Sequence, residues 1–289
     1  MNENQKKEIQ LLTQQYVATY DSQAKAAASI KDTSEATVIQ ILKGRFEGIS
    51  DAMFRNIAKQ VGWNERKSTL VETLNFNTLL LYYSIARDHG ETFAVVARAG
   101  GGKSYTGKWY ANNMKGKNVY YLECAEHWNK KYFLLELLEA MGKNAGGMNI
   151  YEMMKLVVSE LRKQDKPLII IDEVDKLADN TLLFFITLYN QLHGLCGIVW
   201  TSTDAIVKRV DKAVSKNKVG FNEIFSRIGR KFIELPGLNK SELKEICQAN
   251  GITGEEDINR VLNTCEGDVR RINRAYIQKL TKETYKKTA

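Results

Sequence analysis

Proline and cysteine are scarce in this chain, and long apolar runs are missing. Two prolines among 289 residues argue against a proline-rich linker and favour a helix-rich fold. The four cysteines form no Cys-x-x-Cys pair, which argues against a structural zinc site and predicts buried free thiols. No run approaches the ~18 apolar residues of a membrane-spanning helix, and residues 1–7 lack the apolar core of a secretion signal. We therefore expect a cytoplasmic protein that makes no membrane contact.

Length and charge set the next expectations. A chain of 289 residues exceeds one compact core and suits about two domains of ordinary size. The net charge is +8, and residues 205–231 alone hold eight basic and two acidic side chains, a local net charge of +6. A concentrated basic run indicates nucleic acid better than a high overall charge does. A solvated surface loop is the alternative interpretation of that run.

Residues 1–66 carry the patterns of several short helices and are predicted to form an all-α domain. The segments 23–30 and 34–43 are separated by a polar break, and a supporting helix follows. This arrangement is typical of a helix-turn-helix unit, and residues 23–63 resemble the helix-turn-helix domains of phage repressors. In such domains the second helix enters the major groove of DNA; a small helical bundle for protein contacts is the alternative. The side chains expected at the DNA are Ser34, Thr37, Gln40 and Lys43.

Residues 67–235 alternate between apolar strands and helices, whereas residues 236–289 show helical patterns only. Short, continuously apolar strands separated by helices imply a parallel sheet covered on both faces, which is an α/β fold. The expected strands are 92–97, 118–123, 168–171, 197–201 and 232–235.

The strongest motif lies between the first of these strands and the helix that follows it. Ala97–Ser104 has the form of a P-loop, except that Ala97 stands where glycine is usual. Successive backbone N–H groups and the helix N-terminus would bind the phosphates of ATP. Lys103 would reach the β- and γ-phosphates, and the Ser104 hydroxyl would ligate Mg²⁺. The predicted nucleotide-binding residues are Ala97, Arg98, Ala99, Gly100, Gly101, Gly102, Lys103, Ser104 and Tyr105.

A second motif stands 69 positions after Lys103. The apolar strand 168–171 ends in Asp172 and Glu173, at the edge of a parallel sheet where ligands bind. Asp172 is predicted to hold Mg²⁺, and Glu173 to orient or activate the attacking water. An acidic pair at this place favours hydrolysis over phosphoryl transfer to a small molecule, because a kinase must exclude water.

The order of P-loop strand, Asp-Glu strand and a further strand with a polar tip resembles AAA+ ATPases. In that family the polar tip is sensor 1, which implies Thr203, with Ser202 as the alternative. The segment 225–231 resembles the arginine-finger region, through which one subunit reaches the nucleotide of its neighbour. The segment 267–272 resembles sensor 2 of a helical lid formed by residues 236–289. The resemblance implies the catalytic set Lys103, Glu173, Thr203, Arg227 and Arg270, with Arg230 and Arg271 as alternatives for the last two.

Further details resemble one subfamily, the target-selecting transposition ATPases typified by protein B of phage Mu. They are Val71–Thr73, Phe93–Val96, Ile169–Asp175 and Phe225–Ile228. The resemblance implies a homo-oligomer, as filament or ring, on double-stranded DNA. It also implies DNA-stimulated ATP hydrolysis and delivery of target DNA to a transposase, in a bacterial cell that hosts a phage or mobile element. The basic side chains expected at phosphates are Lys130, Lys131, Lys208, Arg209 and Lys212.

Other functions remain open at this point. A replication helicase loader or initiator shares the same core and also needs DNA. A helix-turn-helix regulator could bind one operator and use ATP only to change its oligomeric state. A single-subunit kinase for a small molecule has no role for a helical lid or for Arg227.

Overall fold

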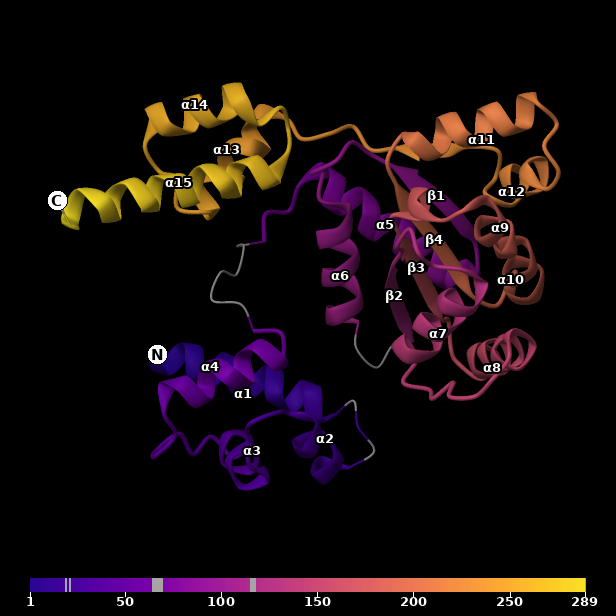
Figure 1. Cartoon of the computed structure of the whole chain (residues 1–289). Helices are drawn as coiled ribbons and strands as arrows, with labels where there is room; N and C mark the ends of the chain where they lie inside the picture. Colours follow the sequence, from indigo (N-terminus) through magenta and orange to yellow (C-terminus); the bar gives the residue numbers. More distant parts are fainter. Residues whose placement is uncertain (19, 21, 64–69, 115–117, 289) are drawn as a thin grey trace. The chain divides into compact units, whose positions relative to one another are not determined.

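The computed structural model describes residues 1–18, 20, 22–63, 70–114 and 118–288 (Figure 1). The chain divides into two compact units, Met1–Ser68 and Thr69–Ala289. The predicted domain boundary between residues 66 and 67 lies outside the described residues. Residues 236–289, which the sequence sets apart as a lid, belong to the same unit as the core. None of the described helices is long and apolar enough to cross a membrane.

Short helices build the first unit, and three of them begin at a serine. Each of these serines accepts a hydrogen bond from a backbone N–H group in the first turn, which satisfies one of the free donors at a helix start. The apolar sides of the helices enclose a small core that includes Ile9, Val38, Ile41 and Phe54. The helices are α1 (Glu3–Val17), α2 (Gln23–Ser29), α3 (Glu35–Leu42) and α4 (Asp51–Gln60).

A five-stranded sheet forms the centre of the second unit, with the order β2-β3-β4-β1-β5. Every neighbouring pair is parallel, which confirms the predicted parallel sheet. This order places the strand before the P-loop, β1, beside β4, and β4 beside β3, so the three predicted nucleotide motifs leave the sheet at one edge. The strands are β1 (Thr92–Val96), β2 (Val119–Glu123), β3 (Leu168–Asp172), β4 (Gly197–Ser202) and β5 (Phe232–Glu234).

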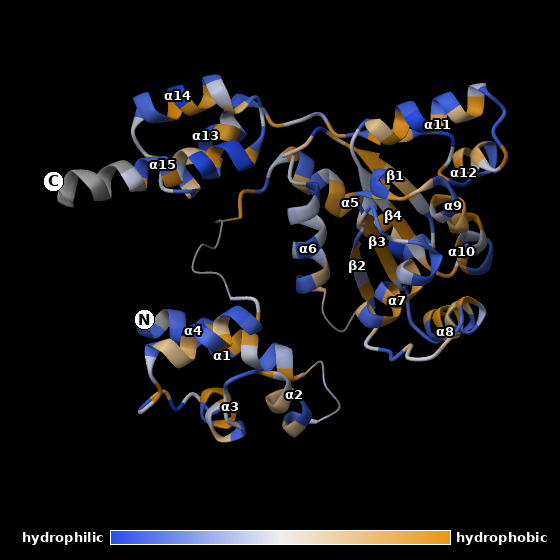
Figure 2. Cartoon of the chain, in the orientation of Figure 1, coloured by the Kyte–Doolittle hydropathy of each residue, from blue (hydrophilic) through white to orange (hydrophobic). Residues whose placement is uncertain are grey.

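Helices cover both faces of the sheet, and alternate residues of the central strands face opposite layers. Ile169 and Ile171 pack into the larger core, whereas Leu168 and Ile170 pack into the smaller one. Both sets are apolar because both faces are covered, as the hydrophobic colouring of β3 and β4 in Figure 2 shows. The smaller core lies under α5 (Leu74–His89) and α6 (Lys103–Asn113). The larger core lies under α7 (Lys130–Ala140), α8 (Ile150–Arg162), α9 (Asp179–Leu182), α10 (Phe184–Leu192), α11 (Ala205–Ser215) and α12 (Phe221–Arg227).

A three-helix segment follows β5 and has a core of its own. It comprises α13 (Lys240–Ala249), α14 (Glu255–Cys265) and α15 (Val269–Thr288). Val71, which precedes α5, packs against this core, and the Leu74 backbone N–H donates to Glu242 at 2.5 Å. The start of the second unit and its C-terminal helices are therefore tied together beside the P-loop.

Candidate nucleotide-binding site

The loop between β1 and α6 has the backbone conformation that its glycines predict. Gly100 and Gly102 have φ angles of 77° and 90°, in the left-handed region that L side chains rarely adopt. A Cβ on Gly100 would lie 2.0 Å from Oδ1 of Asp268, so this position also lacks space for a side chain. Ala97, the departure from the usual motif, is buried and keeps a φ outside the positive region. Alanine is therefore compatible with this loop.

Lys103 begins α6 and folds its side chain back over the loop. Its ammonium donates to the carbonyl oxygens of Ala97 at 2.7 Å and Arg98 at 3.1 Å, and the residue is 8% exposed. Burial lowers the pKa of Lys103, and the carboxylates of Asp172 and Asp175 oppose that shift. The loop carbonyls thus hold the ammonium at the place where a phosphate would compete for it.

Asp172 ends β3 and is fully buried, with both carboxylate oxygens accepting hydrogen bonds. Tyr121 donates its hydroxyl to Oδ2 at 2.8 Å, while the Thr201 hydroxyl and the Glu173 backbone N–H donate to Oδ1. Burial, and then the Asp172 charge, raise the pKa of Tyr121, so this phenol stays a proton donor. The parallel register sets Asp172 opposite Thr201 and explains why the two meet.

The residues present fit a magnesium ion held together with a nucleotide. Asp172 and Ser104 supply the carboxylate and hydroxyl oxygens that Mg²⁺ prefers. Across the described ranges, no cluster of three or more His, Cys, Asp or Glu side chains could hold a metal alone. Mg²⁺ usually binds through one or two carboxylates and the phosphates of its substrate.

Glu173 has a left-handed backbone, with a φ of 56°, at the turn that leaves β3. Such a conformation costs free energy for a residue other than glycine and recurs at functional sites. Its carboxylate forms an ion pair with Lys176 and is partly exposed. Glu173 is therefore available to solvent at the sheet edge, as a residue that activates water must be.

The polar tip of β4 is held by a carboxylate that the sequence reading did not single out. Ser202 donates its hydroxyl to Asp175 Oδ1, and Thr203 donates its hydroxyl to Oδ2, each at 2.7 Å. Burial raises the pKa of Asp175, but the hydrogen bonds from Thr203 and Ser202 outweigh it and leave that pKa below its ordinary value. Both candidates for sensor 1 are thus fixed by one ionised group.

Arg227 ends α12 and lies over α10. Its guanidinium sits 5.1 Å above the ring centre of Tyr189 and donates to Asn190 at 3.1 Å and to Glu223 at 2.9 Å. Arg230, the alternative finger, is exposed and has a φ of 55°. The ring contact and the two acceptors give the Arg227 guanidinium a defined orientation within its own chain.

The start of α15 reaches the P-loop. The Val269 backbone N–H donates to the Gly100 carbonyl oxygen at 3.3 Å. Asp268 accepts hydrogen bonds from the backbone N–H and Nε of Arg270, at 2.9 and 3.2 Å. The charge of Arg270 also contributes to the lowered pKa of Lys103, so this arginine is near the site, whereas Arg271 pairs with Glu266.

The residues predicted to contact DNA lie in different surroundings. Ser34, Gln40, Lys43, Lys131 and Lys212 are exposed, while Thr37 and Lys130 are partly buried. Ser34 caps α3 and bonds the Thr37 hydroxyl, and Lys208 pairs with Asp204 on the surface.

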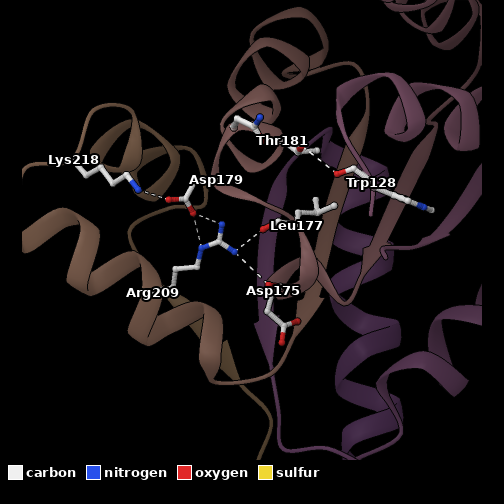
Figure 3. A network of polar contacts seen from close by, with 8 residues as sticks. Trp128, Asp175, Leu177, Asp179, Thr181, Arg209 and Lys218 are labelled. Atoms are coloured by element: carbon white, nitrogen blue, oxygen red, sulfur yellow. Dashed lines mark hydrogen bonds and ion pairs between the residues drawn. The ribbon is translucent and has the colours of Figure 1, made fainter. Parts of the chain in front are cut away.

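Arg209 differs from this group, because its guanidinium points toward Asp179, Leu177 and Asp175 (Figure 3). It pairs with Asp179 and donates to the carbonyl oxygens of Asp175 and Leu177. The predicted phosphate contact of Arg209 stays a prediction, while the structure shows these contacts within the chain.

Sequence reasoning also missed Asn75, near the start of α5. Its side-chain amide donates to the Gly101 carbonyl oxygen at 3.0 Å, and the residue is 1% exposed. The Asn75 Oδ1 atom is buried without a hydrogen-bond partner among the described residues. No local pattern marks Asn75 or Tyr121, whereas Asp268 lies in the segment 267–272 and Asp175 stands in the Asp-Glu-Val-Asp run after β3.

No curated protein matches this chain significantly. Two solved structures are similar at 14% identity: a RuvB mutant from Thermotoga maritima (69% of this chain, 59% of that chain, TM-score 0.41) and NtrX from Brucella abortus in complex with ATP (84% of this chain, 58% of that chain, TM-score 0.47). The chain thus spans less than two thirds of the length of either. A family model described as AAA domain matches residues 86–206. The matched residues include the P-loop, the Asp172-Glu173 strand end and the tip of β4.

Proposed function

We propose that this chain is an ATPase that assembles on double-stranded DNA, selects target DNA and delivers it to a transposase. The observation that carries the ATPase part is the meeting of Lys103, Asp172 and the Asp175-held tip of β4 at one edge of the sheet. These groups follow or end β1, β3 and β4, and the parallel pairing of the three strands brings their carboxyl ends to the same edge.

The chemistry follows from the placed groups. The N–H groups of residues 100–104 and the start of α6 would bind the phosphates, and Lys103 would exchange its two carbonyl acceptors for phosphate oxygens. Ser104 and Asp172 would hold Mg²⁺, which neutralises phosphate charge when bound. Glu173 would accept a proton from the attacking water, while Ser202 and Thr203 contact the γ-phosphate or that water.

Oligomerisation is proposed from Arg227. Among the described residues, the hydrogen bonds and the ring contact of Arg227 are made with α10 and α12 of its own chain, not with the P-loop. An arginine held rigidly but partly exposed suits a nucleotide bound by a neighbouring subunit, because a fixed planar cation stabilises charge that develops during phosphoryl transfer. Assembly and hydrolysis would then depend on each other.

DNA binding is proposed from charge. The segment 205–231 has a local net charge of +6, and Lys212 and Lys216 within it are exposed. Lysines on an exposed surface bind phosphates without reading sequence, which suits a protein that coats DNA. Ser34, Gln40 and Lys43 on the first unit supply a second polar surface of the kind that contacts bases.

Delivery to a transposase rests on the resemblance of Val71–Thr73, Ile169–Asp175 and Phe225–Ile228 to target-selecting transposition ATPases. A helicase loader would share the ATPase and DNA observations. The two are separated by the partner that stimulates turnover, because a transposase would do so in one case and a replicative helicase in the other.

The test is the rate of ATP hydrolysis with and without random-sequence duplex DNA, across protein concentration. We expect a rate that rises with DNA and with concentration, and that Arg227→Ala abolishes. Arg162→Ala is the matched control, since Arg162 is an exposed arginine that donates to a backbone carbonyl on α10. A rate indifferent to both DNA and concentration would contradict the proposal and favour an operator-binding switch.

A further inference from the structure

Arg209 occupies the hub of a polar network beside the nucleotide site (Figure 3). It lies on α11, and its Nε donates to Asp179 Oδ1 at 2.8 Å. Its Nη1 donates to the Leu177 carbonyl oxygen at 2.7 Å and to the Asp175 carbonyl oxygen at 3.3 Å. One guanidinium thus joins α11 to the segment that follows Glu173 and to the start of α9.

The segment that Arg209 holds has little regular structure of its own. Between Asp172 and Asp179 it contains a single 3₁₀ turn, Val174–Lys176. In a segment without regular structure, the side chains keep their positions only if hydrogen bonds hold the backbone. Arg209 donates such hydrogen bonds to two backbone carbonyl groups of this segment. Lys218 adds a second cation to Asp179, so the anchor on α9 is itself held from two sides.

Asp175 connects this anchor to the tip of β4. Its backbone carbonyl accepts from Arg209, while its carboxylate accepts from Ser202 and Thr203. A shift of this segment would therefore move the carboxylate away from both hydroxyl groups. Asp175 alone therefore links Arg209 to the two hydroxyl groups at the tip of β4.

We propose that Arg209 is a positioning residue for ATP hydrolysis: by holding the backbone at Asp175 and Leu177, it keeps the β4 tip in the geometry that turnover requires. The inference rests on the proposed ATPase function and deepens it. It replaces the DNA contact expected for Arg209 from its place in a basic run.

The two roles of Arg209 predict different measurements. A positioning residue acts on turnover without DNA, because its contacts lie inside one chain. A phosphate contact acts on DNA affinity and its salt dependence, and leaves turnover without DNA unchanged. The affinity for ATP separates positioning from general damage to the fold. In the part of the chain that the structure describes, the hydrogen bonds of Arg209 go to Asp175, Leu177 and Asp179, outside the P-loop.

The experiment compares wild type, Arg209→Met and Asp179→Asn, with Arg162→Met as the matched control. The readouts are kcat and KM for ATP without DNA, the affinity for a fluorescent ATP analogue, and DNA affinity against salt. We expect Arg209→Met to lower kcat by about 10- to 100-fold with analogue affinity within about 2-fold of wild type. Asp179→Asn should change kcat in the same direction, and the double variant should show less than the sum of the two effects in free energy.

Each other outcome is decisive. Wild-type kcat in Arg209→Met, with weaker DNA binding and a salt slope reduced by about 1, would overturn the inference and restore the phosphate contact. If Arg209→Met does not fold, the kcat of Asp179→Asn is the test, and a wild-type kcat in that variant overturns the inference. A wild type without any ATP turnover would instead overturn the proposed function, and the inference with it.

Discussion

The ammonium of Lys103 donates to the carbonyl oxygen of Ala97 at 2.7 Å, within the loop that is built to bind phosphate. This lysine is buried and its pKa is lowered by burial, so the folded chain holds a costly charge in place before ATP arrives. Removing the charge should therefore harm binding more than it harms stability.

Lys103→Met should unfold at a temperature no lower than wild type when nucleotide is absent. With ATP and Mg²⁺ the two should differ, since ligand at 100 times its Kd stabilises wild type by about 2.7 kcal/mol and the variant should gain almost nothing. Thermal unfolding with and without ATP measures both effects. An equal ATP-induced shift in the two proteins would contradict the role of Lys103.

Asn75→Ala should weaken ATP binding by about 10-fold, because the Gly101 carbonyl oxygen loses the donor that orients the loop. Asn75→Asp should weaken it further, since a carboxylate placed there repels phosphate. Titration with a fluorescent ATP analogue checks this. Asn77→Ala, at an exposed position on the same helix, is the control and should bind as wild type does.

Gly100→Ala should be more destabilising than Gly142→Ala, although both positions have positive φ angles of 77° and 68°. Alanine in a left-handed conformation costs about 1–2 kcal/mol at either site. At Gly100 the new Cβ would also collide with Asp268, whereas nothing lies within 4 Å at Gly142. Urea unfolding of the two variants measures the difference, and equal losses would mean that α15 does not rest on the P-loop.

The cysteines should be unreactive in the native protein at pH 8. All four are buried, as the sequence predicted. Burial raises the pKa of Cys247 to about 11 and raises the pKa of Cys124 and Cys196 further. A thiol whose pKa lies well above 8 stays protonated at pH 8, and only the thiolate reacts. Alkylation should label no cysteine in buffer and all four in urea; rapid labelling in buffer would show that the cores open.

The sequence predicted the features whose signals are local. The P-loop, the apolar strand that ends in Asp172, and the parallel sheet each depend on neighbouring residues, and the structure has all three. The break between α9 and α10 has no such local signal: the chain forms a short helix from Asp179 and turns at Leu183 before continuing as α10.

The missed features depend on contacts between distant segments. Asp175 meets Ser202 across 27 positions because β3 and β4 are neighbours in the sheet. Arg209 lies in a run of basic residues, and nothing in that run reveals that its guanidinium bends back to Asp179, 30 positions earlier. A local sequence pattern shows the charge of a side chain, but it does not show which distant residue that side chain pairs with.

The central claim, a nucleotide site completed by a neighbouring subunit on DNA, is tested most directly by mixing two inactive variants. The Glu173→Gln variant keeps Arg227 but lacks the carboxylate proposed to activate water. The Arg227→Ala variant keeps Glu173 but lacks the proposed arginine finger. Each alone on duplex DNA should turn over at least about 100-fold more slowly than wild type. A 1:1 mixture should recover about a quarter of the wild-type rate, because head-to-tail neighbours then pair one intact Glu173 with one intact Arg227 at that frequency. A mixture as inactive as its components would contradict the account.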